Sequence, residues 1–216
     1  MNPWISAWLS PRATIRHVVA ENPNRALWWL ASVYGFSSLL NAFQSLMLGL
    51  TLPVVGILAL AALLSPLWGY VFFSLWGWVV TLTGKWLKGQ GHFKQVRAAY
   101  AWSCVPLLVN IPLWFLLAFY FGAPLFSNFA ETHVLTSAQV SMLFLVLIIR
   151  IAAAVWSLIV YIHMLAEVQQ FSILRSIGNI VIASVIVALI SILFFYVLGS
   201  VTQPSANVVL NSLRML

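Results

Sequence analysis

The sequence predicts an all-α, polytopic integral membrane protein with five transmembrane helices and an N-terminal cytoplasmic amphipathic helix at the membrane interface. The 216 residues are 63% hydrophobic and only 6% charged, a composition typical of chains that fold in lipid. Five apolar stretches are long enough to cross a bilayer. Because no loop between them approaches the size of a soluble domain, residues 1–216 are expected to form a single membrane domain.

Each predicted span holds about 20 or more apolar residues, the length that a hydrocarbon core of about 30 Å requires. The spans are residues 26–50, 54–83, 99–122, 140–164 and 177–200. The second is longer than the bilayer needs, so we expect it to tilt, to kink at Pro66 or to project from the membrane. Its division into two re-entrant halves is the alternative. Residues 201–216 form a predicted external tail.

The distribution of positive charge predicts the orientation, because Lys and Arg collect in cytoplasmic loops. Positive residues precede the first span and fill the second and fourth loops, whereas the opposite side carries only Arg214. The positive residues on the predicted cytoplasmic side are Arg12, Arg16, Arg25, Lys85, Lys88, Lys94, Arg97 and Arg175. The N-terminus is therefore predicted to be cytoplasmic and the C-terminus external.

Residues 1–25 are predicted to lie on the cytoplasmic leaflet. Ser10 is a plausible N-cap, with Pro11 at the first helical position. Apolar positions oppose arginines at helical spacing, so the apolar side is expected in the acyl boundary and the arginines near anionic headgroups. The apolar side and the aromatic anchors are Ile15, Val18, Val19, Trp4 and Trp8. A solvated arm is the alternative.

The candidate headgroup contacts extend beyond this segment to the second cytoplasmic loop. Positive residues in both places would face anionic lipid. These candidates are Arg12, Arg16, Lys85, Lys88, Lys94 and Arg97.

A cluster of polar residues is predicted near the middle of the membrane. Arg150 interrupts the aliphatic run LVLIIRIAAAV. Counted at 1.5 Å per residue from the cytoplasmic ends, Arg150, Asn41 and Asn110 lie roughly 20, 22 and 16 Å deep. Asn41 belongs to a polar stripe on one face of the first span that includes Tyr34, with Gln44 one position away from it. These five residues form the candidate binding or tethering cluster.

Arg150 has no predicted carboxylate at its own depth. The chain contains no aspartate, and none of Glu21, Glu131 and Glu167 lies in the middle of a span. An arginine at this depth normally faces the protein interior and finds partners. It could tether helices through the two asparagines and carbonyls freed near prolines, or form a positive site in a water-filled or lipid-filled cavity. It could also snorkel outward or contact a second subunit. Proton coupling through midplane carboxylates is disfavoured.

The second cytoplasmic loop, GKWLKGQGHFK, combines glycines with positive charge. Gly84, Gly89 and Gly91 could present backbone donors to a phosphate, although the Lys-Ser/Thr pair of a Walker sequence is absent. The alternative is an ordinary positive loop on the cytoplasmic side. Both interpretations stay open.

No known catalytic or metal-binding motif is present, so we predict neither an enzyme nor a cofactor or metal site. Sequences of the HExxH, GxSxG and CxxC types are missing, and the single Cys104 is expected to be a small core residue. His163 and Glu167 lie one helical turn apart and could share a metal or a proton, or form a solvated helix end. Nucleic acid is not expected as a partner, because the positive residues follow the topology.

The chain resembles the YIP family, five-span membrane proteins named for Ypt and Rab interaction. The resemblance runs from NPW and SPRATIR through NPNRALWWLASVYG to GKWLKGQGHFKQVRAAYAWSCVPLL and the last two spans. Eukaryotic members carry a Gly-Tyr-Ser-x-x-Pro-like element entering the third span. Ala101, Trp102, Ser103 and Pro106 occupy that pattern here, with Ala for Gly and Trp for Tyr.

The departures from the family limit what the resemblance implies. This chain lacks both the long cytosolic N-terminal region and the Asp-Leu-Tyr-Gly-Pro-like element of eukaryotic members, so Rab binding is not carried over. The short form is similar to bacterial members, which implies residence in the inner (plasma) membrane if the source is bacterial. The expected function is non-enzymatic organisation of membrane or partner proteins, with anionic lipids, another copy of the chain or a membrane protein as partners. The alternative is a transporter or lipid-handling protein with a polar cavity around Arg150.

Overall fold

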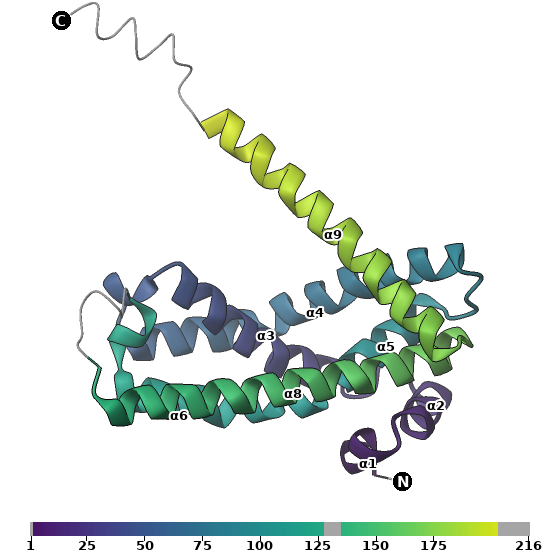
Figure 1. The fold of residues 1–216 in the computed structure, drawn as a ribbon, viewed down its shortest axis with the longest axis horizontal. Coiled ribbons are helices and arrows are strands. Elements are labelled where there is room, and N and C mark those ends of the chain that lie inside the picture. The colour runs from purple at the N-terminus through teal and green to yellow at the C-terminus, as the bar shows by residue number, and fades with distance from the viewer. Residues whose placement is uncertain (1, 128–134, 203–216) are drawn as a thin grey trace, which may run out of the picture.

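The computed structural model describes residues 2–127 and 135–202, and every regular element in these ranges is helical, which confirms the all-α class. Helices α3, α4, α6 and α8 form an elongated bundle, and α9 leaves it at one end (Figure 1). In chain order, with η for 3-10 helices, the elements are α1 Pro3–Leu9, α2 Pro11–Glu21, α3 Leu27–Ser45, η1 Leu48–Leu50, α4 Val54–Trp86, α5 Phe93–Ser103, η2 Val105–Val109, α6 Asn110–Phe121, η3 Ala123–Phe126, α8 Ser137–Gln169 and α9 Ile173–Thr202.

Four helical segments in the described part of the chain are long and apolar enough to cross a membrane: Val54–Trp86, Phe93–Phe121, Ser137–Gln169 and Ile173–Gly199. They coincide with the second to fifth predicted spans, so the chain is a multi-pass integral membrane protein. Helix α3 occupies the first predicted span, but it is only 19 residues long and more polar than α4, α8 and α9. That α3 also crosses the membrane, as a fifth span, stays a prediction. Helix α4 continues through Pro66 without dividing into halves.

The third span changes its winding where proline interrupts it. Pro106 has no N–H to donate, and the chain tightens into η2, with Leu107 N donating to Cys104 O at 2.9 Å. Pro112 stands in the first turn of α6, where a backbone donor has no partner to lose. The segment therefore crosses as α5, η2 and α6 in succession.

Glycines allow α3 and α4 to touch through their backbones. A Cβ at Gly69 would overlap the carbonyl oxygen of Ala31, and a Cβ at Gly35 would overlap that of Ser65. These pairs run in opposite order along the two helices, so the helices are antiparallel. Small residues at such a crossing bring the backbones close enough for extensive van der Waals contact, the main source of helix association in lipid.

The apolar side of α2 lies against protein, which corrects the prediction that it enters the acyl boundary. Ile15 and Val18 are fully buried in a cluster that also contains Leu27 and Trp102, and α2 packs on α5 and α8. Ser10 and Pro11 do occupy the cap and the first helical position. The helical spacing correctly indicated a two-sided helix, but periodicity does not specify whether lipid or protein covers the apolar side.

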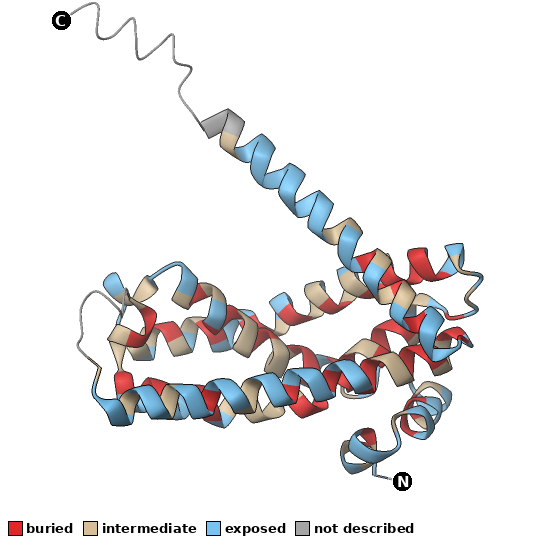
Figure 2. Ribbon diagram, in the orientation of Figure 1, coloured by how far each residue is buried: buried red, intermediate tan, exposed pale blue. Residues whose placement is uncertain are grey.

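The hydrogen bonds that join α9 to the bundle, among the described residues, lie in its first three turns. Asn179 accepts from Thr83 Oγ1 at 2.6 Å and donates to Val80 O at 3.2 Å, and Ser176 Oγ donates to Ile162 O at 3.0 Å. Beyond Ala183, which is buried, the residues are mostly exposed up to Leu198. Figure 2 colours the outer part of this helix mainly pale blue, for exposed residues. Most of the predicted tail at 201–216 lies outside the described residues.

Candidate functional site

Arg150 lies near the middle of α8 with its guanidinium over an aromatic ring. The guanidinium carbon is 4.3 Å from the ring centroid of Trp114, a geometry that stabilises a cation through the negative face of the ring. Nε and Nη2 of Arg150 are both buried, and neither has a hydrogen-bond partner in the described structure. The positive charge is thus partly stabilised, while two of its donor nitrogens are unused.

The structure brings Asn41 and Asn110 to Arg150, as predicted from their depth. The three side chains line one cavity of about 210 Å³ together with Leu107, Trp114 and Ala154. Oδ1 of Asn110 is buried with no partner, and Nδ2 of Asn41 donates to Ser37 O at 2.8 Å. No hydrogen bond among the described residues joins Arg150 to either asparagine, so the direct tether considered from the sequence is not formed.

The other two predicted members of this cluster lie elsewhere. Gln44 Nε2 donates to Leu125 O at 3.0 Å, near the end of the bundle that holds η3. Tyr34 packs among aromatic rings, with centroids 5.1 Å from Phe73 and 5.2 Å from Phe72. Neither lines the Arg150 cavity.

A second cavity continues from the first along α8. Its volume is about 190 Å³, it shares Leu107 and Ala154 with the Arg150 cavity, and it reaches Ser157 and Tyr161. Arg150, Ala154, Ser157 and Tyr161 recur at i, i+4, i+7 and i+11, which places them on one helical face. This spacing is visible in the sequence and could have predicted the shared face.

The polar groups of the second cavity are already bonded within the protein. Ser157 Oγ donates to Ser103 O at 2.8 Å, and Trp76 Nε1 donates to Tyr161 Oη at 3.0 Å. Unlike Arg150, these residues therefore hold α8 to its neighbours. The unsatisfied polar groups on this face of α8 are concentrated at the Arg150 end.

The residues that carry the family resemblance are packed where three parts of the chain meet. Trp102 is buried and lies 5.0 Å, centroid to centroid, from Trp4 of α1. Ser103 O accepts the hydrogen bond from Ser157 of α8, and Pro106 lies in the first turn of η2. Ala101 is also buried. In this structure the motif joins the third span to α8 and to the N-terminal helices.

Arg97 corrects the prediction that it contacts lipid headgroups. It is 6% exposed, and its guanidinium donates to Tyr70 Oη at 3.1 Å, Ser74 Oγ at 3.2 Å and Asn24 Oδ1 at 2.9 Å. The guanidinium also lies over the rings of Tyr70 and Phe93. Charge counting assigned Arg97 to a loop, whereas α5 begins at Phe93 and turns Arg97 into the bundle.

The other basic candidates are exposed at the same end of the molecule, namely Arg12, Arg16, Lys85, Lys88 and Lys94. Arg16 also pairs with Glu167 of α8, with 2.7 Å between Nη2 and Oε1. Glu167 is therefore engaged by α2, and His163 Nδ1 lies 2.8 Å from Ile159 O, so these two residues do not form the shared site considered from the sequence.

The glycines of the second loop fit around one side chain of α8. Gly91 N donates to Gln169 Oε1 at 3.1 Å, and a Cβ at Gly84 or Gly89 would overlap the amide of Gln169. Gln90 N donates to Gln169 O at 3.2 Å. Two backbone N–H groups of the loop therefore donate to Gln169 of α8. This favours a packing role for the glycines over phosphate binding.

These features define a helical, multi-pass membrane protein with a polar cavity inside an apolar bundle. Comparison with protein families identifies a Yip1 domain over residues 5–195. The chain therefore belongs to the Yip1 domain family, which confirms the resemblance seen in its sequence. Neither curated proteins nor solved structures gave a match to this chain.

Proposed function

We propose that this family member is a non-enzymatic membrane protein that organises the lipids around it, and that the Arg150 cavity binds one anionic group. The group is a lipid phosphate or a free anion of the same chemistry. One observation carries the proposal: two guanidinium nitrogens of Arg150 are buried beside a cavity of about 210 Å³, without a partner among residues 2–127 and 135–202.

The energetics of a buried arginine support an anionic occupant. A charge at the bilayer centre costs about 2.5 to 3.5 kcal/mol even on insertion scales. The contact with Trp114 recovers about 2 kcal/mol when it is desolvated, but it supplies no hydrogen-bond acceptor. An anion would supply the missing hydrogen-bond acceptors and neutralise the charge. The ring of Trp114 lies over the guanidinium, so it takes none of the N–H donors, which point outward in the guanidinium plane.

The position of the cavity favours access from the side of the bundle. Asn41 and Ala154, which line it, are exposed, and the neighbouring face of α8 shows the apolar side chains Ile151, Val155 and Leu158. In a membrane such a face meets lipid. A lipid can therefore reach Arg150 without crossing the core of the protein.

The cavity beside Ser157 and Tyr161 favours lipid handling as a second candidate function. It extends the Arg150 cavity along α8 toward the end of the bundle where α2 lies. Because the two cavities share Leu107 and Ala154, a headgroup bound at Arg150 would lie next to the second cavity. Organisation without transfer requires only the first cavity, whereas lipid handling requires both.

The test compares the anions and lipids that co-purify with the protein. Native mass spectrometry of the wild type and of Arg150→Gln is expected to show one anionic species that only the wild type retains. Arg175→Gln removes one charge from an exposed residue and should retain it. A phospholipid mass identifies lipid as the source, and a small anion identifies solute. Identical profiles in the wild type and Arg150→Gln would refute the proposal.

A further inference from the structure

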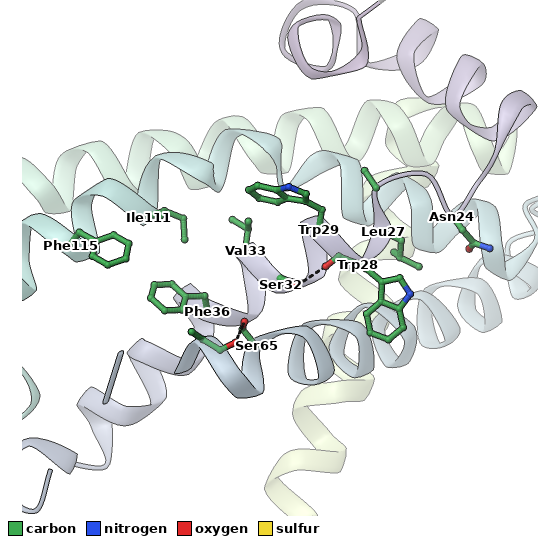
Figure 3. Close-up of a pocket in the computed structure, with 12 residues that line it drawn as sticks. Asn24, Leu27, Trp28, Trp29, Ser32, Val33, Phe36, Ser65, Ile111 and Phe115 are labelled. Atoms are coloured by element: carbon green, nitrogen blue, oxygen red, sulfur yellow. Dashed lines mark hydrogen bonds between the residues drawn. The ribbon is translucent and has the colours of Figure 1, made fainter. Parts of the chain in front are cut away.

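A groove of about 750 Å³ runs along α3, with α4 and α6 as its other walls. Figure 3 shows Trp28 and Trp29 flanking one end, Phe36 and Phe115 at the other, and Asn24 beyond Trp28. The volume falls within the range of about 300 to 1,000 Å³ typical of ligand sites. The groove lies away from Arg150, which lines none of it.

The interior of the groove presents apolar surface. Its two serines satisfy their hydroxyls within their own helices, since Ser32 Oγ donates to Trp28 O at 2.8 Å and Ser65 Oγ donates to Ala62 O at 2.9 Å. Both serines line the groove without offering it a free donor. A hydrocarbon chain suits such a surface better than a polar ligand does.

The length of the groove matches one leaflet. Leu27 and Phe36 are nine residues apart on α3, which corresponds to about 14 Å along the helix axis. Half of a hydrocarbon core of about 30 Å is roughly 15 Å. Two tryptophans, more than half exposed, mark the end near Asn24, and tryptophan is enriched at the membrane–water interface.

The end of the groove near Asn24 lies next to the positive charge of Arg97, which no carboxylate among the described residues neutralises. Asn24 Oδ1 accepts from the buried Arg97, and Trp28 stacks on Tyr70, another partner of Arg97, with centroids 4.4 Å apart. All hydrogen-bond acceptors of Arg97 in the described chain are neutral. The two described carboxylates are engaged elsewhere, Glu21 by Arg25 and Glu167 by Arg16.

We propose that the groove holds one acyl chain of an anionic phospholipid, with its phosphate beside Asn24 in the field of Arg97. A second copy of this chain is a poorer occupant, because each copy carries a net charge of +7 and only three carboxylates. The site differs from the Arg150 cavity in its walls and in its use of an acyl chain, so it does not depend on the proposed function.

The test uses the delipidated full-length protein in detergent. Phosphatidylglycerol and phosphatidylcholine with identical chains are titrated separately, and bound lipids are counted by native mass spectrometry. The Arg150→Gln background removes any contribution from the other cavity. Binding of one phosphatidylglycerol, about fivefold tighter than phosphatidylcholine, is expected.

Two variants separate the acyl chain from the charge. Ser32→Phe fills the groove and should abolish binding of both lipids, whereas Ser141→Phe at an exposed position of α8 should not. Asn24→Asp gives Arg97 a carboxylate partner in place of the amide oxygen, so we expect the fold to be kept. The variant should lose the preference for phosphatidylglycerol, while phosphatidylcholine still binds.

Three outcomes would overturn the proposal. The wild-type groove could bind both lipids equally, which would remove the role of Arg97. Ser32→Phe could retain phosphatidylglycerol, which would place the lipid elsewhere. Ser32→Phe could also convert a dimer to a monomer without changing the lipid count, which would identify a second copy as the occupant.

Discussion

Two arginines inside the bundle are accommodated in different ways. Arg97 donates to three neutral oxygens and lies over two aromatic rings. Only its Nε lacks a partner among the described residues, so the protein itself fixes most of this side chain. Arg150 has one ring beneath it, and two of its nitrogens have no partner in the part of the chain that the structure describes. The first arrangement is typical of a structural residue, and the second leaves capacity for a ligand.

This difference predicts that Arg97→Gln destabilises the protein. Glutamine cannot reach all three acceptors of Arg97, and losing hydrogen bonds to a charged group should lower the free energy of unfolding by about 2 to 3 kcal/mol. Thermal or denaturant unfolding in detergent measures the change. Lys94→Gln, at an exposed position of the same helix, should change it by no more than about 0.5 kcal/mol. Equal stability of the two variants would contradict the assignment.

The sequence predicted half of the Arg150 cavity because depth can be counted along a helix. Arg150, Asn41 and Asn110 share a depth and meet, whereas Tyr34 lies seven residues from Asn41 on the same face, about 10 Å away along the axis. Gln44 lies off that face. Trp114 was missed, since an aromatic residue in an apolar span gives no sign of the cation above it until the rotation of each helix is known.

At the scale of elements, the crossing of α3 and α4 depends on glycine. Gly69→Ala would drive a Cβ into the backbone of Ala31, so the helices must separate, at a cost of about 3 kcal/mol. Unfolding in detergent again gives the measurement. Gly178→Ala on α9 meets nothing within 4 Å and should instead stabilise by about 0.5 to 1 kcal/mol, the helical preference for alanine. A neutral Gly69→Ala would mean that the helices are further apart.

The predicted spans agree with the helices in position but not at their ends. Apolar runs identify the part that lipid can solvate, whereas helices continue into polar sequence: α8 covers Ser137–Gln169 against a predicted 140–164, and the third segment begins at Phe93 rather than residue 99. That early start carries Arg97 into the bundle. Hydropathy also could not place α2 against protein, because both lipid and a protein surface accept an apolar side.

At the scale of the whole molecule, five crossings require α3 to span the membrane. Single cysteines replacing Arg12, Met47 and Lys88, in a chain with Cys104→Ala, test this with an impermeant maleimide on intact cells. We expect labelling of Met47→Cys only, with Arg12→Cys and Lys88→Cys labelled once the membrane is opened, because positive loops stay inside. If Arg12→Cys and Met47→Cys were labelled under the same conditions, α3 would not cross the membrane.

Helix α8 is continuous from Ser137 to Gln169 and connects two distant sites of the molecule. At one end the helix is gripped by the glycine loop at Gln169 and by Arg16 at Glu167, and 19 residues away, about 28 Å along the axis, it carries Arg150. A helix transmits displacement along its length. A partner that binds the second cytoplasmic loop and shifts it would therefore also move the wall of the Arg150 cavity. By thermodynamic reciprocity, filling that cavity would alter how the loop receives its partner.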